Sequence, residues 1–549
     1  MFDTAARLFY RYVCKRSSTF TLAIVISAVF FERAYDEACE YIFETVNNGM
    51  ALSHKIILFS ILITAHLAKA NRYDFKPTEE SENIQQSNHE FVIHSSNTGY
   101  RPYTPSHQPY TPHQPYTPIP SQLYYPSDIS FRFSNVGLQR IGRNFIKSNR
   151  IISLSLDNNN ISDVSPFAFR GMPNLRHLNL SGNRIPRKKL LSLNGNDNLQ
   201  TLIINDNNDT SNDNSNEEEI LKESESFQSL EHLQLCNNQL RDIAITFFIS
   251  MPILTHLHLS NNSISSSNTV FDNIPTTLTH LNLKKNLIDH IDQDKLRYLH
   301  ELVMDDNEIT QVCFEECQEK SIPLRGAIGM KNLSLSSNRI FEVSADAFND
   351  MEHLLNLDLS GNEIANLAST IFNNTHRIIN LSLANNILAT IPNVCPILNL
   401  ESMNLTGNRI SLIPSDAFCR LQRLKYLYLS NNMITTIETR AFNLPSLTYL
   451  DLSGNQLRQL PAQWTLPWQI QELHLERNYF TELDDLSLIN IKSLRDVYLD
   501  GNPMLKLKVR SFHALSAHDM MLHLKNISVV EDKCTQCEKD DEENDSEYD

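Results

Sequence analysis

The sequence predicts an α/β solenoid, a coil of about sixteen short repeats whose strands form one parallel sheet on the concave side. A Leu-x-x-Leu-x-Leu-x-x-Asn-x-Leu pattern recurs from Phe131 onward, mostly at a spacing of about 24 residues. An asparagine occupies the ninth motif position in fifteen repeats, and an opening variant has Val136 there instead. These asparagines are Asn159, Asn183, Asn207, Asn238, Asn262, Asn286, Asn307, Asn338, Asn362, Asn386, Asn408, Asn432, Asn455, Asn478 and Asn502.

The repeated motif is similar to that of the leucine-rich repeat family. This resemblance implies a horseshoe in which each repeat supplies one strand and stacks its leucines on the neighbouring repeats. A buried asparagine amide can bond backbone groups of its own and the adjacent coil, so we assign the motif asparagines to structure rather than catalysis. We place the repeat domain at residues 128–525. Several repeats carry a further phenylalanine after the motif, as in secreted and cell-surface family members: Phe169, Phe348, Phe372, Phe418 and Phe442.

Residues 1–49 contain a separate apolar segment. Ser17 to Phe31 has no charged residue, and its length lies between that of a membrane span and that of a buried helix. Lys15 and Arg16 precede it, and the start of the chain has few acidic residues. An unrelated signal anchor is one interpretation of such a segment.

The run Phe30-Phe-Glu-Arg-Ala-Tyr-Asp36 closely resembles the small subunit 9 of the mitochondrial cytochrome b-c1 complex, complex III of the respiratory chain. The resemblance implies a single-span helix at Thr19 to Phe31, in an accessory subunit of the inner membrane without a redox centre of its own. Its partners would be complex III subunits, in mitochondrial electron transport. The family's short basic tail is missing after Gly49.

Residues 50–70 have the parts of a secretory signal peptide. His54 and Lys55 form a basic start, Ile56 to Ala65 is apolar, and Ala68-Lys69-Ala70 is a cleavage motif of small residues. A signal peptide belongs at an N-terminus, so residues 1–49 and 50–549 resemble parts of two different proteins. The join is either a real gene fusion or an error in the gene prediction, and the complete internal signal favours the error.

Two segments without apolar periodicity flank the repeats. Residues 71–127 repeat the letters PYTP at 102–105, 109–112 and 115–118, and this proline content favours a stiff, disordered linker. The alternatives are a ligand for an aromatic groove and a glycosylated stalk. Residues 526–549 form an acidic tail, which we expect to be disordered. No apolar stretch follows the repeats, so we expect no C-terminal membrane anchor.

Function in a solenoid depends on the strand residues that face outward, at the third, fifth and seventh motif positions. His232, His256 and His280 occupy the third position of three consecutive repeats, with His258 beside them. Adjacent strands lie about 4.8 Å apart, so the imidazoles should form a row. We call these four residues the histidine row. It is open to three interpretations: a transition-metal site, an acid-sensitive surface, or ordinary exposed side chains.

A second group of outward positions is rich in tyrosine. Tyrosine offers a large contact area and a hydroxyl group at low entropic cost, and it is enriched in protein-binding hot spots. It is also a common strand residue, which is the simpler explanation. We call this group the aromatic surface; it comprises Tyr426, Tyr428, Tyr449, Asp451, His474 and Tyr498.

Asn-x-Ser/Thr sequons predict N-glycosylation of a secreted chain. Asn332, Asn380 and Asn404 fall on the concave face in the middle of the array. Glycans there would shield the middle and leave partners to bind at the two ends, where the histidine row and the aromatic surface lie. The predicted sites are Asn160, Asn208, Asn261, Asn332, Asn373, Asn380, Asn404 and Asn526.

The net charge and the number of cysteines argue against two classes of protein. A formal net charge of −17 argues against nucleic-acid binding through phosphates. Nine cysteines are too few for a disulfide-dense scaffold. Cys395 and Cys419 lie in successive repeats and are candidates to pair. Cys313/Cys317 and Cys534/Cys537 are candidates for local bridges.

The chain has no phosphate-binding loop, nucleophile elbow or metalloprotease motif, so we expect no enzyme, cofactor or metal. The first function that remains is a secreted, non-enzymatic leucine-rich repeat module that binds a protein on its concave face. The second is an accessory component of complex III in the mitochondrial inner membrane, through the N-terminal segment. The third is a matrix or adhesion protein of the extracellular space.

Overall fold

The computed structural model describes residues 129–193, 196–207, 227–241, 248–265, 271, 274–315, 320–419, 421–466, 470–489, 491–504, 506–508, 511–512, 515, 520–525 and 528–530. The predicted single-span helix, signal peptide and linker lie outside these residues, as does the tail beyond residue 530. Within the described part of the chain, no helix is both long and apolar enough to cross a membrane.

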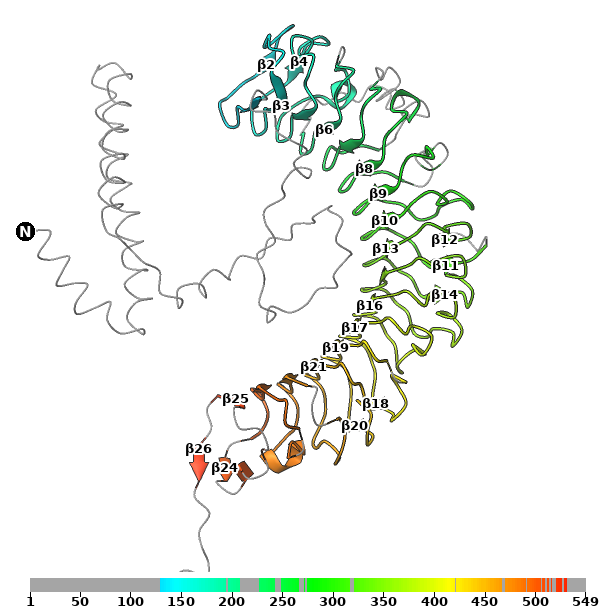
Figure 1. The fold of residues 1–549 in the computed structure, drawn as a ribbon, viewed down its shortest axis with the longest axis vertical. Helices are drawn as coiled ribbons and strands as arrows, with labels where there is room; N and C mark the ends of the chain where they lie inside the picture. The colour runs from blue at the N-terminus through cyan, green and yellow to red at the C-terminus, as the bar shows by residue number, and fades with distance from the viewer. Residues whose placement is uncertain are drawn as a thin grey trace, which may run out of the picture. The chain divides into compact units, whose positions relative to one another are not determined.

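Seventeen short parallel strands form one continuous sheet along the inner side of a curved coil (Figure 1). Each strand pairs with the next sheet strand along the chain, from β1 to β25. This arrangement confirms the predicted solenoid and its parallel sheet. The strands are β1 (Ile129–Arg132), β3 (Ile151–Ser155), β5 (His177–Asn179), β6 (Thr201–Ile203), β7 (His232–Gln234), β8 (His256–His258), β9 (His280–Asn282), β10 (Glu301–Val303), β13 (Asn332–Ser334), β15 (Asn356–Asp358), β16 (Asn380–Ser382), β17 (Ser402–Asn404), β19 (Tyr426–Tyr428), β21 (Tyr449–Asp451), β22 (Glu472–His474), β23 (Asp496–Tyr498) and β25 (Met521–His523).

The outer side of the coil differs from the α/β expectation, because the described residues contain no α-helix. Turns, short strands and 3-10 helices connect the end of one inner strand to the start of the next instead. A repeat of about 24 residues leaves only a short outer segment, and helices of that length are marginal. These elements are β2 (Arg140–Ile141), β4 (Asp163–Val164), β11 (Gln311–Cys313), β12 (Ser321–Pro323), β14 (Glu342–Val343), β18 (Leu412–Ile413), β20 (Thr436–Ile437), β24 (Lys506–Lys508), β26 (Ser528–Val530), η1 (Arg187–Lys189), η3 (Phe248–Ser250) and η4 (Leu483–Leu486).

One continuous core runs inside the coil. The central residue of each inner strand from β5 to β23 is buried; Leu357 of β15 and Leu381 of β16, for example, lie side by side in register. The five predicted phenylalanines are also buried, and the rings of Phe348 and Phe372 stack with centroids 6.4 Å apart. Each repeat therefore completes its core only against its neighbours.

The motif asparagines bond the backbone as predicted. In Asn386, the side-chain amide donates to the carbonyls of Leu359 (2.9 Å) and Leu383 (3.1 Å), and its oxygen accepts from the Ile364 N–H (3.0 Å). One buried side chain thus satisfies backbone groups of two coils. Asn362 and Asn432 make the same set of bonds one and two repeats away.

A disulfide links Cys395 and Cys419 across two successive repeats, with Cα atoms 5.5 Å apart. The structure therefore supports the candidate pairing of these residues. Cys317, Cys534 and Cys537 of the other two candidate bridges lie outside the described residues.

Candidate binding surface on the concave face

The inner strands present alternate residues to the open side of the sheet. In β8, Leu257 is buried, while His256 and His258 on either side of it are partly exposed. The same alternation occurs in β7 and β10. The third and fifth motif positions therefore face the concave side, as predicted.

The histidine row forms a stack across three strands. His232, His256 and His280 pair in register, and their ring centroids lie 4.2 and 4.1 Å apart. The ring of His300, which was not predicted from the sequence, meets that of His280 edge-on, with the ring centroids 6.5 Å apart. It precedes β10 by one residue, so motif position alone did not indicate it.

The environment of the histidine row disfavours the charged form of its imidazoles. Burial, followed by repulsion from neighbouring imidazoles, lowers the pKa of His256 to about 3 and that of His258 to about 4. The pKa values of His232 and His280 are also lowered, mainly by burial. His256 and His258 therefore stay neutral at pH 5–7, and this does not favour the acid-sensitive interpretation for these two residues. In the described part of the chain, no group of three or more His, Cys, Asp or Glu residues could hold a metal ion.

The aromatic surface is a chain of ring contacts over strands β19 to β23. The ring of Tyr449 lies between those of Tyr428 and His474, at 5.1 and 5.2 Å. The rings of His474 and Tyr498 stack at 4.3 Å with an interplanar angle of 3°. Tyr426 lies at the edge of this group, with its ring 6.5 Å from Tyr449. The structure therefore brings the predicted aromatic residues together.

His474 is held between two carboxylates. Its Nε2 lies 3.0 Å from a Glu472 oxygen, and its Nδ1 lies 3.0 Å from a Glu476 oxygen. Burial lowers the pKa of this imidazole, but hydrogen bonds to both carboxylates outweigh it and raise the pKa to about 9. His474 is therefore a buried cation at neutral pH, stacked on Tyr498. Burial also raises the pKa values of Tyr428 and Tyr449, so their hydroxyls stay protonated.

Several residues of this surface were not predicted from the sequence. Glu472 and Asp496 occupy the third motif position beside the tyrosines, and Glu476 and Asp500 occupy the seventh. His523 of β25 extends the stack, because its ring lies 4.1 Å from that of Tyr498. The carboxylates could have been found by reading the outward positions for charge as well as for aromatic rings.

In the middle of the concave face, polar side chains on neighbouring strands form hydrogen bonds with one another. Asn332 donates to a Glu301 carboxylate (2.9 Å), Asn356 donates to Asn332 (2.6 Å), and Asn380 donates to Asn356 (2.6 Å). Small polar side chains occupy the neighbouring outward positions, such as Ser382 of β16. Much of the hydrogen-bonding capacity of this region is thus used within the sheet.

The sequons differ in exposure. Asn160, Asn261 and Asn373 are exposed, and Asn332 and Asn380 are half-buried on the concave face. Asn404 is only 6% exposed, so the folded sheet encloses this predicted glycan acceptor. Asn208 and Asn526 lie outside the described residues.

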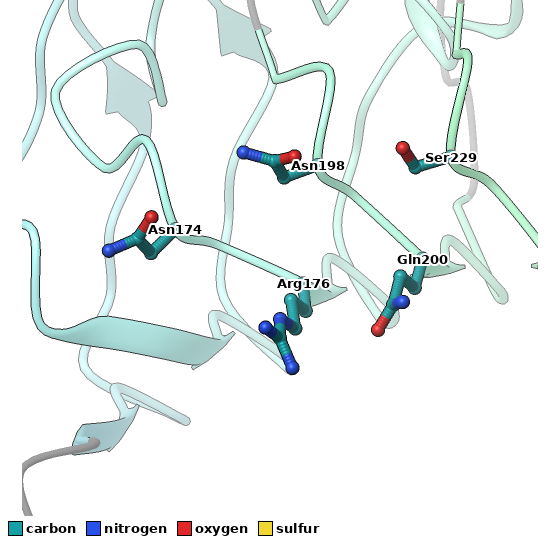
Figure 2. Close-up of a pocket in the computed structure, with 5 residues that line it drawn as sticks. All are labelled: Asn174, Arg176, Asn198, Gln200 and Ser229. Atoms are coloured by element: carbon teal, nitrogen blue, oxygen red, sulfur yellow. The ribbon is translucent and has the colours of Figure 1, made fainter.

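A polar hollow lies at the edge where strands β5 to β7 begin (Figure 2). Asn174 and Asn198 lie on successive coils, and the side chains of Arg176 and Gln200 extend in the same direction. Asn174 and Asn198 donate to backbone carbonyls of the preceding coils. These amides link one coil to the next by hydrogen bonds, so we assign them a structural role. Ser229 completes the lining.

Comparison with known proteins decides the family of the N-terminal segment. The family model described as cytochrome b-c1 complex subunit 9 matches residues 7–54. Subunit 9 of Bos taurus is 47% identical over 49 residues, which are 9% of this chain and 75% of that protein. Subunit 9 of Drosophila melanogaster is 46% identical over 43 residues, 8% of this chain and 78% of that protein. Through these residues, the chain belongs to the cytochrome b-c1 complex subunit 9 family.

The subunit 9 segment is followed by leucine-rich repeats. A leucine-rich repeat family model matches residues 139–208, 228–277 and 399–457. A chain from the Drosophila Toll–Spatzle complex superimposes with a TM-score of 0.58 at 19% identity, over 73% of this chain and 54% of that one. The glycosylated form of that complex gives 0.56 at 20% identity, over 75% and 56%. This chain spans about half the length of these solved chains, and the likeness shows a shared fold.

Proposed function

We propose that the repeats form a secreted, non-enzymatic module that binds a protein partner on its concave face. The observation that carries the proposal is the aromatic surface, where the partly exposed rings of Tyr426 and Tyr498 lie on either side of the buried Tyr449, on the consecutive strands β19 to β23 and beside charged side chains. Such a combination of rings and polar groups on a rigid sheet is typical of binding hot spots. Leucine-rich repeat domains typically bind proteins, and the sequence of residues 50–70 supports secretion.

Site-specific photo-crosslinking tests the binding face. A benzophenone amino acid in place of Tyr426 should give a crosslinked protein adduct when the full chain is produced in cells of its own organism. The matched control carries the same amino acid in place of Phe341. This residue is 52% exposed and lies after β13, in the segment that leads away from the inner sheet. Adducts at 341 alone, or at neither position, would contradict a concave binding face.

A second function has its own support. The match of residues 7–54 to subunit 9 favours a place in complex III of the mitochondrial inner membrane. This proposal concerns the N-terminal segment, and it excludes secretion of the same polypeptide. The two functions therefore differ in where the natural chain begins.

N-terminal sequencing of the natural protein separates these proposals. We expect a mature chain that starts at Asn71, because cleavage after Ala70 would remove both preceding segments. A tryptic peptide from Ala34 to Lys55, AYDEACEYIFETVNNGMALSHK, comes only from a chain that crosses the join. Recovery of that peptide from purified mitochondria would overturn the secreted form and favour the complex III proposal.

A further inference from the structure

The concave end at β21 to β25 combines aromatic rings with an excess of negative charge. Five carboxylates occupy its outward positions: Asp451, Glu472, Glu476, Asp496 and Asp500. One imidazolium, His474, lies among them, and the Lys525 ammonium pairs with Asp500 at 2.7 Å. Five negative charges less these two positive charges leave three, next to the partly exposed rings of Tyr426 and Tyr498.

Nearby cations do not cancel this excess. Lys425 precedes Tyr426 and pairs with Glu401 of the adjoining coil at 2.8 Å. Arg495 precedes β23 and Arg477 follows β22, so neither occupies an outward strand position. His523 lies 2.9 Å from Asp496, which orients that carboxylate.

Two of the carboxylates retain unused acceptor atoms. Glu476 Oε2 and Asp500 Oδ1 are shielded from solvent and accept no hydrogen bond from the described residues. Both side chains remain accessible as a whole, at 25% and 30% exposure. A positively charged partner can therefore approach both carboxylates, whereas the two shielded oxygens themselves lie out of reach of any group as large as a water molecule.

We propose that this end of the concave face, extending the aromatic surface, binds a basic protein segment rich in arginine and lysine. A guanidinium group can lie over the partly exposed ring of Tyr426, and others can donate to the carboxylates in and after β22 and β23. The proposal rests on the proposed binding function and specifies the partner's chemistry. The chain's own acidic tail does not fit as occupant, because it carries the same charge as the surface.

The other parts of the concave face do not offer this combination. The environment of the histidine row lowers the pKa values of its imidazoles, and no tyrosine lies among its four residues. The middle has small side chains and the amide chain from Asn332 to Asn380. A basic segment would therefore bind at one end of the face, and its position should be sensitive to local substitutions.

Fluorescence anisotropy with the full chain tests the proposal. The probe is a short fluorescein-labelled peptide of alternating Arg and Ser, and the comparison peptide alternates Glu and Ser. We expect the basic probe to bind, less tightly as salt is added, and the acidic peptide not to bind. The double variant E476Q/D500N should weaken binding of the basic probe about tenfold. Glutamine at 476 keeps an acceptor for His474, which protects the fold.

A matched control removes the same charge elsewhere. The variant E352Q/E363Q changes two exposed glutamates outside the inner strands and should bind the probe like the unmodified chain. Y426L should weaken binding about threefold without any change of charge. Equal binding of the probe by all variants would overturn the proposal. So would a second result: the chain associates with itself, E476Q/D500N abolishes that association, and the basic probe does not bind. Crosslinks at position 426 without probe binding would overturn the basic partner and leave the proposed function standing.

Discussion

Replacing Asn386 with alanine is expected to lower the free energy of unfolding by about 3 kcal/mol. The substitution leaves the carbonyls of Leu359 and Leu383 and the N–H of Ile364 without their buried partner. Each unsatisfied group costs about 1–3 kcal/mol, and partial relaxation or entry of water offsets some of that sum. Urea unfolding of the chain measures the total change.

Hydrogen exchange shows which repeats lose stability in the Asn386→Ala variant. Because each repeat contacts only its neighbours, the loss of protection should centre on the coils around residues 359–388. The control is Asn374→Ala, which removes an exposed amide bonded to Asn349 on the preceding coil. We expect less than about 0.5 kcal/mol from it. Equal losses from both variants would refute the structural role of the motif asparagine.

The repeat period made most of this fold predictable. A leucine that recurs at fixed spacing can be buried only if successive strands stack in register, as Leu357 and Leu381 do. The motif asparagine is predictable for a related reason, since its hydrogen bonds depend on position within the repeat and not on distant parts of the chain. Cys395 and Cys419 were candidates to pair because they lie in adjacent repeats, and the structure joins them.

The features that were missed do not follow the motif. The outer side of the repeats has no shared pattern, so the sequence did not show that turns and 3-10 segments stand where the α/β class implies helices. His523 falls where the motif decays, and its contact with Tyr498 appears only once β25 joins the sheet. The low pKa values of His256 and His258 result from burial, which the exposed position of a strand residue does not indicate.

Stability near the aromatic surface is expected to fall as pH rises through about 9, because His474 loses its proton there. The folded pKa of about 9 lies above the ordinary value of 6.5, so the folded state binds the proton more tightly. The resulting stabilisation is complete below pH 6.5 and disappears above pH 9. A shift of this size corresponds to about 3 kcal/mol, at 1.36 kcal/mol per pKa unit. The side chain of His474 is 6% exposed, so solvent screens this contribution only weakly.

The variant His474→Gln isolates this contribution from the tyrosines and lysines that also titrate at high pH. Glutamine can donate to one carboxylate but carries no charge, so Glu472 and Glu476 are left facing each other without a cation between them. Urea unfolding at pH 6 should therefore separate the two proteins by about 3 kcal/mol, and the gap should close toward pH 10. A gap that is the same at both pH values would mean that His474 contributes packing against Tyr498 and not charge. In that case the negative excess at this end would be larger at neutral pH, and a basic partner would meet one more uncompensated carboxylate.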